Sequence, residues 1–445
     1  MRGVPNKAEE SLSLSDILYD DNGSLLQHAL MTGFIVDEGW LLGHFSSQTS
    51  LTLISNKTIN ARPADQRIIR VFPELPRPQV QIIHTKIMLL FFPGFVRFVV
   101  SSANLAEDDW SVLQNIVFVQ DFMRDPSLVF PANEFSMSLA YALHDLSVPF
   151  EIIGWMNSVD FSTAIAQIVT SVPTGGQRMN MNMAEYGMER LAVVIKSIKK
   201  PNTTLLDYEF TPDARMYCVG SSLGPLDHRW LRDIYLCAHG INPRHHRDTL
   251  WKNTVPDNLI DIAVAFHTQE QVDKCRYDVD CSQYIYARPE TFNAREFPQS
   301  HMFRVQPHFS RTIVHAKVIL TRVGGDQTCG WMYLGSHNFT PGAWGRLQVK
   351  SGEDIYVNNY EFGIVLNDML FVDQLDQNGN KDSRASLLSA LFGFSLADIK
   401  IKLLPLVTAL SLSGISVNGL VCVVPVVLGY ISAAFVSVVL GWPAI

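Results

Sequence analysis

The sequence predicts an α/β protein made of two similar domains that are related by a pseudo-twofold axis. Apolar, strand-like segments alternate with helical segments in both halves of the chain, which is typical of sheets covered on both faces. A His-x-Lys pair on an apolar run occurs once in each half, and each pair is followed at a similar distance by Ser-x-Asn and a tryptophan. Two copies of such a group indicate an internal duplication.

Composition sets broad limits on the kind of protein. The chain has 445 residues, of which 47% are hydrophobic and 18% charged, as expected for a globular protein of two or three domains. The net charge of −8 gives no overall attraction to nucleic acid, so a polyanion would need a local basic groove. The six cysteines are scattered without a CxxC pair, which indicates neither a disulfide framework nor a zinc site and suits a reducing compartment. The N-terminal segment has no apolar core, so we expect no signal peptide.

The first domain is expected over residues 20–178. Residues 24–45 predict a helix and a strand, and residues 79–92 and 94–105 predict two adjacent buried strands turned at Pro93 and Gly94. Residues 134–148 have helical spacing and end before a proline. The polar, glycine-bearing stretch that follows, from 171 to 183, is a candidate domain junction.

The second domain is expected over residues 179–402. Residues 188–200 predict an amphipathic helix, and three strand-like segments follow later in the chain, at 311–320, 329–339 and 360–366.

Residues 403–445 form a hydrophobic tail, because no charged residue follows Lys402. The stretch 419–444 is long enough to span a bilayer, and the lysines on its N-terminal side suit a tail anchor with the rest of the protein in the cytosol. A buried helical hairpin and an aberrant C-terminus are the alternatives.

The first His-x-Lys pair lies in an apolar run from Ile82 to Phe92. Side chains alternate along a strand, so His84 and Lys86 are expected to share one face. A buried ammonium without a partner costs several kcal/mol. For this pair alone, either the surrounding structure satisfies both groups or the face lines a site for an anion.

The second pair repeats the arrangement with His315 and Lys317. From His84 to Asn104 there are 20 positions and from His315 to Asn338 there are 23, and a tryptophan follows each asparagine by six positions. Two lysines and two asparagine amides can surround one tetrahedral phosphate. Two histidines on opposite sides can act in line, one attacking phosphorus and the other protonating the leaving oxygen. The pattern therefore predicts phosphoryl transfer that needs no metal or other cofactor.

These motifs resemble those of the phospholipase D superfamily, whose members carry two His-x-Lys motifs. Most members have an aspartate five residues after the lysine, where this chain has Phe91 and Arg322. That departure, together with an asparagine in each Ser-x-Asn turn, resembles the tyrosyl-DNA phosphodiesterase family. The resemblance runs from about residue 34 to residue 366 and implies two phospholipase D-like α-β-α sandwich domains. Residues 80–83 include no aromatic side chain that could stack on a base, and beyond residue 366 the tail replaces the family's C-terminal region.

The resemblance implies a role for each motif residue. His84 matches the nucleophile that forms a phosphohistidine with the DNA 3′ end, and His315 matches the general acid that protonates the departing tyrosine and then serves as base for water. The phosphate ligands would be Lys86, Lys317, Asn104 and Asn338. Gln114 and Glu361 are the candidates for orienting the histidines, although Gln114 needs a one-residue shift and Glu361 could be an ordinary strand-edge carboxylate. Ser221 and Ser222 resemble DNA-strand contacts, although serine-glycine loops are common.

The expected activity is hydrolysis of 3′-phosphotyrosyl and related adducts at single- or double-stranded DNA ends during DNA repair. The resemblance also implies a nuclear monomer, with the tail as a separate candidate for membrane contact. A lipid phosphodiesterase and a non-catalytic DNA-end-binding protein are the alternatives. The missing aspartates argue against the first, and the intact His-x-Lys pairs argue against the second.

Overall fold

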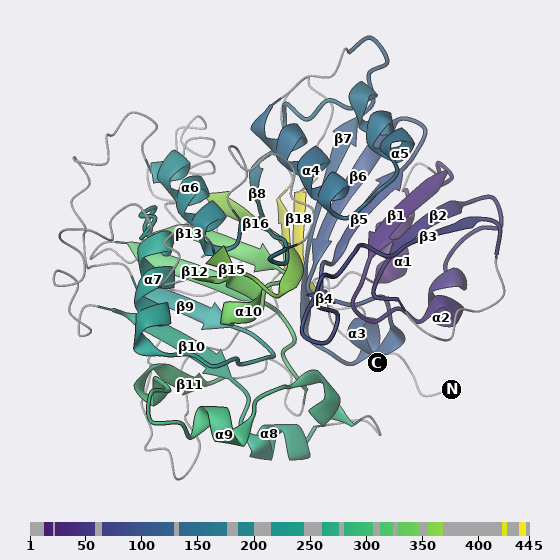
Figure 1. The fold of residues 1–445 in the computed structure, drawn as a ribbon. Helices are drawn as coiled ribbons and strands as arrows, with labels where there is room; N and C mark the ends of the chain where they lie inside the picture. The colour runs from purple at the N-terminus through teal and green to yellow at the C-terminus, as the bar shows by residue number, and fades with distance from the viewer. Residues whose placement is uncertain are drawn as a thin grey trace.

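Within the part of the chain that can be described, the strands of the computed structural model form two eight-stranded sheets and a two-stranded ribbon (Figure 1). The structure describes residues 13–20, 23–57, 65–128, 133–175, 186–199, 215–243, 260–275, 280–305, 312–323, 328–347, 355–367, 421–424 and 436–441.

The first sheet is mixed, with the order β17-β18-β7-β6-β5-β1-β2-β3. Its strands are β1 (His28–Thr32), β2 (Ser50–Ile54), β3 (Ile68–Val71), β5 (Ile87–Phe91), β6 (Phe95–Ser101), β7 (Asn115–Met123), β17 (Val421–Val424) and β18 (Val436–Gly441). The central strands β5, β6 and β7 form an antiparallel meander, and β5 also pairs antiparallel with β1. The predicted turn between two buried strands is confirmed, because β5 and β6 form this hairpin.

The second sheet has the order β11-β10-β9-β12-β13-β16-β4, with β8 also paired to β16. Its strands are β4 (Ile82–Ile83), β8 (Ala166–Ser171), β9 (Arg215–Val219), β10 (Ile262–Phe266), β11 (Met302–Arg304), β12 (Val318–Val323), β13 (Thr328–Gly335) and β16 (Asn359–Asn367). A short ribbon, β14 (Arg346–Leu347) with β15 (Ile355–Tyr356), lies beside it. Of the three strand-like segments expected in the second half, 329–339 and 360–366 are confirmed as β13 and β16. The strand expected over 311–320 is wrong for most of its length, because β12 begins only at Val318, after His315 and Lys317.

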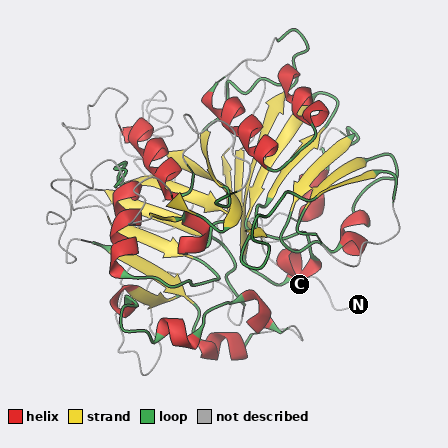
Figure 2. Cartoon of the chain, in the orientation of Figure 1, coloured by secondary structure: helices red, strands yellow, loops and turns green. Residues whose placement is uncertain are grey.

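Helices flank both sheets (Figure 2). Those of the first half are α1 (Leu14–Leu18), α2 (Glu38–Leu42), α3 (Glu107–Ser111), α4 (Glu134–Asp145), α5 (Phe150–Gly154) and the 3₁₀ turn η1 (Trp155–Ser158). Those of the second half are α6 (Met188–Lys199), α7 (His228–Ala238), α8 (Gln269–Asp273), η3 (Cys281–Tyr284), α9 (Pro289–Phe292), η4 (Gln299–His301) and α10 (Pro341–Trp344).

The longer helices form where the sequence provides caps and an apolar stripe. Asn133 caps α4 by accepting from the Ser136 backbone N–H, and the two residues form a reciprocal capping box. Phe135, Leu139 and Leu143 then follow at spacings of four and are buried on one face of α4. The predicted helices at 134–148 and 188–200 are therefore confirmed as α4 and α6.

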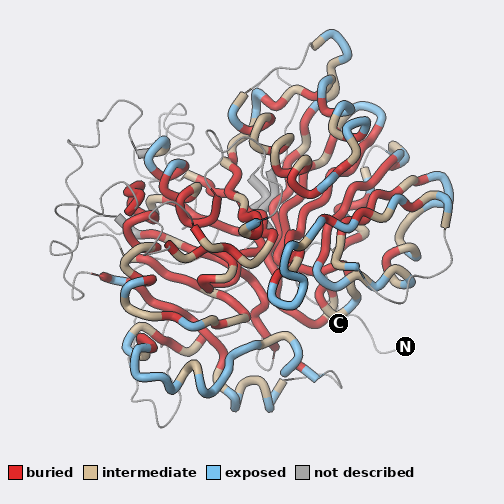
Figure 3. Tube along the Cα trace, in the orientation of Figure 1, coloured by how far each residue is buried: buried red, intermediate tan, exposed pale blue. Residues whose placement is uncertain are grey.

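The largest apolar cluster lies between the two halves and holds them together. It contains Phe98 and Phe118 of the first sheet together with Leu334 and Phe362 of the second, and the rings of Phe98 and Phe362 lie 6.1 Å apart edge to face. Two further clusters lie on the outer faces, one under α1, α2 and α3 and one under α6, α7 and α10. Buried backbone consequently runs through both sheets and across their junction (Figure 3).

The predicted α/β class with two similar halves is confirmed by these layers. The expected domain boundary between residues 178 and 179 lies outside the described residues. The second sheet already begins before it, since β8 pairs antiparallel with β16 from Ala166↔Leu366 to Ser171↔Glu361.

Most of the hydrophobic tail lies outside the described residues. Its two described segments are strands, with β18 paired antiparallel to β7 and β17 paired to β18. Among the described residues, no helix is long and apolar enough to cross a membrane.

The scattered cysteines were not expected to form a disulfide framework, and one disulfide is present among the cysteines that the structure describes. Cys275 and Cys281 are joined with an S–S distance of 2.16 Å. The η3 turn begins at Cys281, and the two Cα atoms lie 6.3 Å apart, within the usual range for a disulfide. Cys218 and Cys237 are free and buried.

Candidate active site

The first His-x-Lys segment crosses from one sheet to the other. β4 ends at Ile83 and pairs with β16 of the second sheet, whereas β5 begins at Ile87 and pairs within the first. The expected continuous strand through His84 and Lys86 is therefore wrong, because the backbone on each side pairs with a different sheet. The Lys86 Nζ donates to the His84 carbonyl oxygen at 2.9 Å, so a local bend places the two side chains.

The second His-x-Lys segment makes the same kind of crossing in the opposite direction. Val314 forms an isolated parallel bridge with Gln114 of the first half, and the His315 N–H donates to the Gln114 carbonyl at 2.8 Å. β12 of the second sheet begins immediately afterwards, at Val318. The Lys317 Nζ donates to the His315 carbonyl oxygen, as Lys86 does to that of His84. Each histidine thus lies at the junction of the halves.

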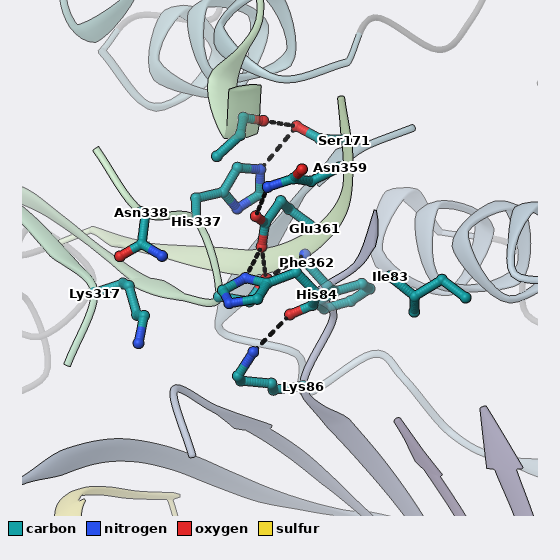
Figure 4. Close-up of polar contacts among 12 residues, drawn as sticks. Ile83, His84, Lys86, Ser171, Lys317, His337, Asn338, Asn359, Glu361 and Phe362 are labelled. Carbon is teal, nitrogen blue, oxygen red and sulfur yellow. Dashed lines mark hydrogen bonds and ion pairs between the residues drawn. The ribbon is translucent and has the colours of Figure 1, made fainter. Parts of the chain in front are cut away.

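His84 is held by a carboxylate from the second half. Its Nδ1 lies 2.8 Å from the Glu361 Oε2, which also accepts from the Ser336 hydroxyl, and the Asn359 amide donates to Oε1 at 2.9 Å (Figure 4). A carboxylate only accepts, so Nδ1 carries the proton and the Nε2 lone pair of the neutral ring is unused by this contact. The predicted orienting candidate Glu361 therefore lies against His84.

His315 is held by an amide from the first half. Its Nδ1 lies 3.0 Å from the Asn115 Oδ1. The Asn115 Nδ2 donates to the Asp109 carbonyl at 2.8 Å, and the Ser102 hydroxyl donates to Oδ1 at 2.8 Å, so both ends of the amide are fixed. The oxygen therefore faces the histidine, His315 donates from Nδ1, and Nε2 remains available.

Gln114 does not orient His315 through its side chain, and this part of the prediction was wrong. Its amide instead donates to the Thr312 hydroxyl, while its backbone carbonyl accepts from His315. Neighbouring residues of an extended segment point to opposite faces. The one-residue shift that the choice of Gln114 required therefore selected a side chain on the wrong face. Asn115, the next residue, faces His315.

The two halves correspond hydrogen bond by hydrogen bond. In each Ser-x-Asn turn the serine backbone N–H donates to the carbonyl of an apolar strand residue, at 2.9 Å in both halves. The N–H of that apolar residue donates back to the serine hydroxyl, at 2.9 Å in the first half and 3.0 Å in the second. The residue that precedes this apolar residue accepts a hydrogen bond from the histidine of the other half. The corresponding trios are Ser102, Asn115 and Ile116 in the first half and Ser336, Glu361 and Phe362 in the second.

The two asparagines of these turns are anchored through their oxygens. The Asn338 Oδ1 accepts from the backbone N–H groups of Ser221 and Ser222 at 3.0 and 3.1 Å. The Asn104 Oδ1 accepts from the Ile35 N–H at 3.3 Å, and its Nδ2 lies 3.2 Å from the Asp109 Oδ1. The backbone N–H groups of Ser221 and Ser222 therefore position Asn338. The contact with a DNA strand that the resemblance implies for these two serines is a separate prediction.

The lysines bring positive charge into a buried site. Lys86 and Lys317 are 1% and 0% exposed. Burial lowers the pKa of Lys86 to about 8, against the opposing charges of Glu361 and Asp109. Burial and the neighbouring Lys86 hold the pKa of Lys317 well below its usual value. Figure 4 shows Lys317 and Asn338 on one side of the His84 ring and Lys86 below it.

The same burial favours the neutral form of both histidines. It lowers the pKa of His84 to about 4, although Glu361 acts in the opposite direction. Burial, reinforced by the charges of Lys317 and Lys86, lowers the pKa of His315 well below 6.5. Burial would raise the pKa of Glu361, but its interaction and hydrogen bond with His84, together with His337 and the charge of Lys86, lower it to about 2. A neutral His84 beside an ionised Glu361 is the form that a nucleophile requires.

Sequence reasoning missed Asn115, Asp109 and Ser336. Aligning the two halves on their strands would have found Asn115, because it immediately precedes an apolar run as Glu361 does. No group of three or more histidine, cysteine or acidic residues able to hold a metal occurs in the described segments.

Two crossing His-x-Lys segments on duplicated sheets define a protein with the phospholipase D fold. The chain belongs to the tyrosyl-DNA phosphodiesterase family, whose family model matches residues 1–397. The crystal structure of the yeast tyrosyl-DNA phosphodiesterase matches with a TM-score of 0.60 at 16% identity, covering 80% of this chain and 86% of that one. A mutant of the yeast protein matches with a TM-score of 0.61, also at 16% identity, covering 80% of this chain and 85% of that one. These likenesses confirm the fold.

Two curated relatives are similar in sequence as well. Tyrosyl-DNA phosphodiesterase 1 of Arabidopsis thaliana is 26% identical over 391 residues, covering 81% of this chain and 60% of that protein. The Drosophila melanogaster protein of the same name is 22% identical over 404 residues, covering 80% and 63%. The chain thus spans less than two thirds of the length of these two relatives.

Proposed function

We propose that this chain hydrolyses the phosphodiester that joins a tyrosyl group to a DNA 3′ end. The observation that carries the proposal is the reciprocal placement of the histidines, each of which donates through Nδ1 to a side chain of the other half. Both Nε2 atoms are thereby left for chemistry. Lys86, Lys317, Asn104 and Asn338 surround the phosphate with positive charge and amide donors, which stabilises the charge that develops in the transition state.

In the first step the His84 Nε2 lone pair attacks phosphorus. The P–N bond forms as the bond from phosphorus to the tyrosyl oxygen breaks, and protonated His315 gives its Nε2 proton to that oxygen. The carboxylate of Glu361 stabilises the positive charge that the His84 ring gains on bonding to phosphorus, because it is 2.8 Å from Nδ1.

In the second step the now neutral His315 takes a proton from water. The water oxygen attacks phosphorus, the P–N bond breaks, and His84 leaves as a neutral imidazole. DNA departs with a 3′ phosphate, and His315 is again protonated. The acid of one step is therefore the base of the next, so one histidine serves both proton transfers.

Turnover of a 3′-phosphotyrosyl oligonucleotide tests the proposal, with a phosphatidylcholine vesicle as the competing substrate. We expect free tyrosine and a 3′-phosphate oligonucleotide, with and without EDTA. Phospholipid cleavage without oligonucleotide cleavage would support a lipid phosphodiesterase instead. Binding of the oligonucleotide without any turnover would support a DNA-end-binding protein.

We also propose a nuclear location, which rests on the family resemblance alone. Tail contact with membranes is a separate proposal, supported by the uncharged composition of 403–445. Vesicle flotation of the full chain against a chain ending at residue 402 tests it, and equal flotation would refute it.

A further inference from the structure

Asp109 is a buried carboxylate that lies beside His315. It lies in α3 of the first half and is 1% exposed. Its Oδ1 accepts from the Asn104 backbone N–H at 2.7 Å and lies 3.2 Å from the Asn104 Nδ2. The same oxygen lies 3.4 Å from the His315 Nδ1. Burial raises the pKa of the Asp109 carboxyl, whereas the hydrogen bonds from Asn104 and the charges of Lys317 and Lys86 lower it. All three neighbours of Oδ1 can donate hydrogen bonds, so the contacts themselves favour the ionised form.

The general acid assigned to His315 needs such a charge. An acid must hold its proton at working pH, yet burial and the charges of Lys317 and Lys86 favour neutral His315, and a proton on His84 or His267 would act in the same direction. Glu361 is engaged with His84, and the hydrogen-bond partner of His315 is the uncharged amide of Asn115. The Tyr284 ring lies 6.2 Å away, and its hydroxyl donates to Asp108 at 2.7 Å.

The internal duplication shows that this carboxylate is not simply part of the repeated scaffold. Asp109 follows Asn104 by five positions, and the residue five positions after Asn338 is Ala343, which is fully buried. The half that supplies Glu361 to His84 thus has no carboxylate at this place. Each histidine therefore has one carboxylate from the other half, at non-equivalent positions.

We propose that Asp109 is a positioning residue for this reaction, which fixes Asn104 toward the phosphate and supplies the negative charge that lets His315 carry a proton. The inference rests on the proposed function. It predicts that removing the charge of Asp109, without removing its hydrogen bonds, weakens acid-base catalysis more than substrate binding.

Asp109→Asn is the sharpest test, because Oδ1 keeps its contacts and only Oδ2, whose single contact is the long one of 3.4 Å from the Asn104 Nδ2, becomes NH₂. Glu107→Gln is the matched control, since it removes one charge from an exposed position of the same helix. In Asp109→Asn we expect kcat on the 3′-phosphotyrosyl oligonucleotide to fall roughly 10–100-fold, KM to change by less than about threefold, and the pH optimum to move down, because a pKa lower by one unit is a tenfold change in proton affinity. Glu107→Gln should match the wild type.

The NMR titration of His315 gives a readout that does not depend on turnover. With inorganic phosphate bound, the His315 pKa should be lower in Asp109→Asn than in the wild type by about one unit or more. An unchanged pKa, or equal losses in kcat and binding, would overturn the proposal. If the wild type fails to release tyrosine, the proposed function fails while this titration still reports on Asp109.

A rescue variant covers the case in which the single variant folds poorly. Asp109→Asn combined with Asn115→Asp returns one carboxylate to the His315 Nδ1 at the position that corresponds to Glu361. Recovery of at least about tenfold in kcat over the single variant would support a charge role, again by the scale of one pKa unit. A folded double variant without recovery, or a wild-type His315 pKa below about 4 with phosphate bound, would refute it.

Discussion

The two halves of the site share one backbone plan but differ in the chemistry that they present to the histidines. His84 receives the carboxylate of Glu361 at 2.8 Å, whereas His315 receives the amide of Asn115 at 3.0 Å. A histidine that becomes a phosphohistidine gains lasting positive charge, so a directly bonded anion suits it. A histidine that must both give and take a proton is better served by a neutral hydrogen bond, with an anion slightly farther away. The duplicated backbone places both histidines in the same way, and the different residues at the equivalent positions, Glu361 and Asn115, give the two histidines different environments.

Removing His84 should have the largest effect, because it forms the covalent bond. His84→Ala should show no covalent adduct and no turnover of labelled 3′-phosphotyrosyl DNA on a denaturing gel. His28→Ala is a useful control, since His28 is also buried but bonds to Ser50 and Thr52 at a distant part of the first sheet. Adduct formation by His84→Ala would assign the nucleophile to the other half.

Removing His315 should stop the reaction midway. A phenol has a pKa of about 10 and leaves without full help, whereas water has a pKa of about 15.7 and needs a base. His315→Ala should therefore slow the second step by roughly 10²–10⁴-fold and accumulate DNA linked to His84. Single-turnover gels measure both steps, and a first step slowed as much as the second would remove the proposed asymmetry.

Replacing the carboxylate behind His84 should have a smaller effect that depends on pH. Glu361→Gln keeps an acceptor for Nδ1 but removes the charge, and we expect kcat near pH 7 to fall roughly 10–100-fold as transition-state stabilisation is lost. His84 must be neutral to attack, and its pKa is about 4 because burial outweighs Glu361. Removing Glu361 lowers that pKa further, so the acid limb of kcat/KM should move to lower pH. A limb that moves upward would contradict the assigned contact.

The sequence was sufficient for what the duplication repeats. The His-x-Lys pairs and the Ser-x-Asn turns occur twice, and the structure brings His84, Lys317 and Asn338 into one region. The sequence was not sufficient to predict the site residues that occur in only one half. Asp109 sits in the first turn of α3 after Glu107 and Asp108, a place where exposed acids are common, so nothing in the pattern marks it as buried.

The break at His84 could not be predicted from apolar character either. The residues from Ile82 to Phe92 suit a strand throughout, and only the pairing of Ile82 and Ile83 with β16 forces the chain to change sheets. Such a pairing joins positions far apart in the chain, so local periodicity does not contain it.

The smallest effect separates Asn115 from its neighbour Gln114. Asn115→Ala removes the Oδ1 that accepts from His315, so we expect kcat to fall about tenfold, within the range for a lost positioning bond to a general acid. Gln114→Ala leaves the backbone carbonyl that accepts from His315 and removes only the bond to Thr312. It should cost about 1 kcal/mol of unfolding free energy with little change in kcat. Paired measurements of kcat and urea unfolding test the contrast, and a larger kcat loss in Gln114→Ala would restore the assignment that the sequence alone favoured.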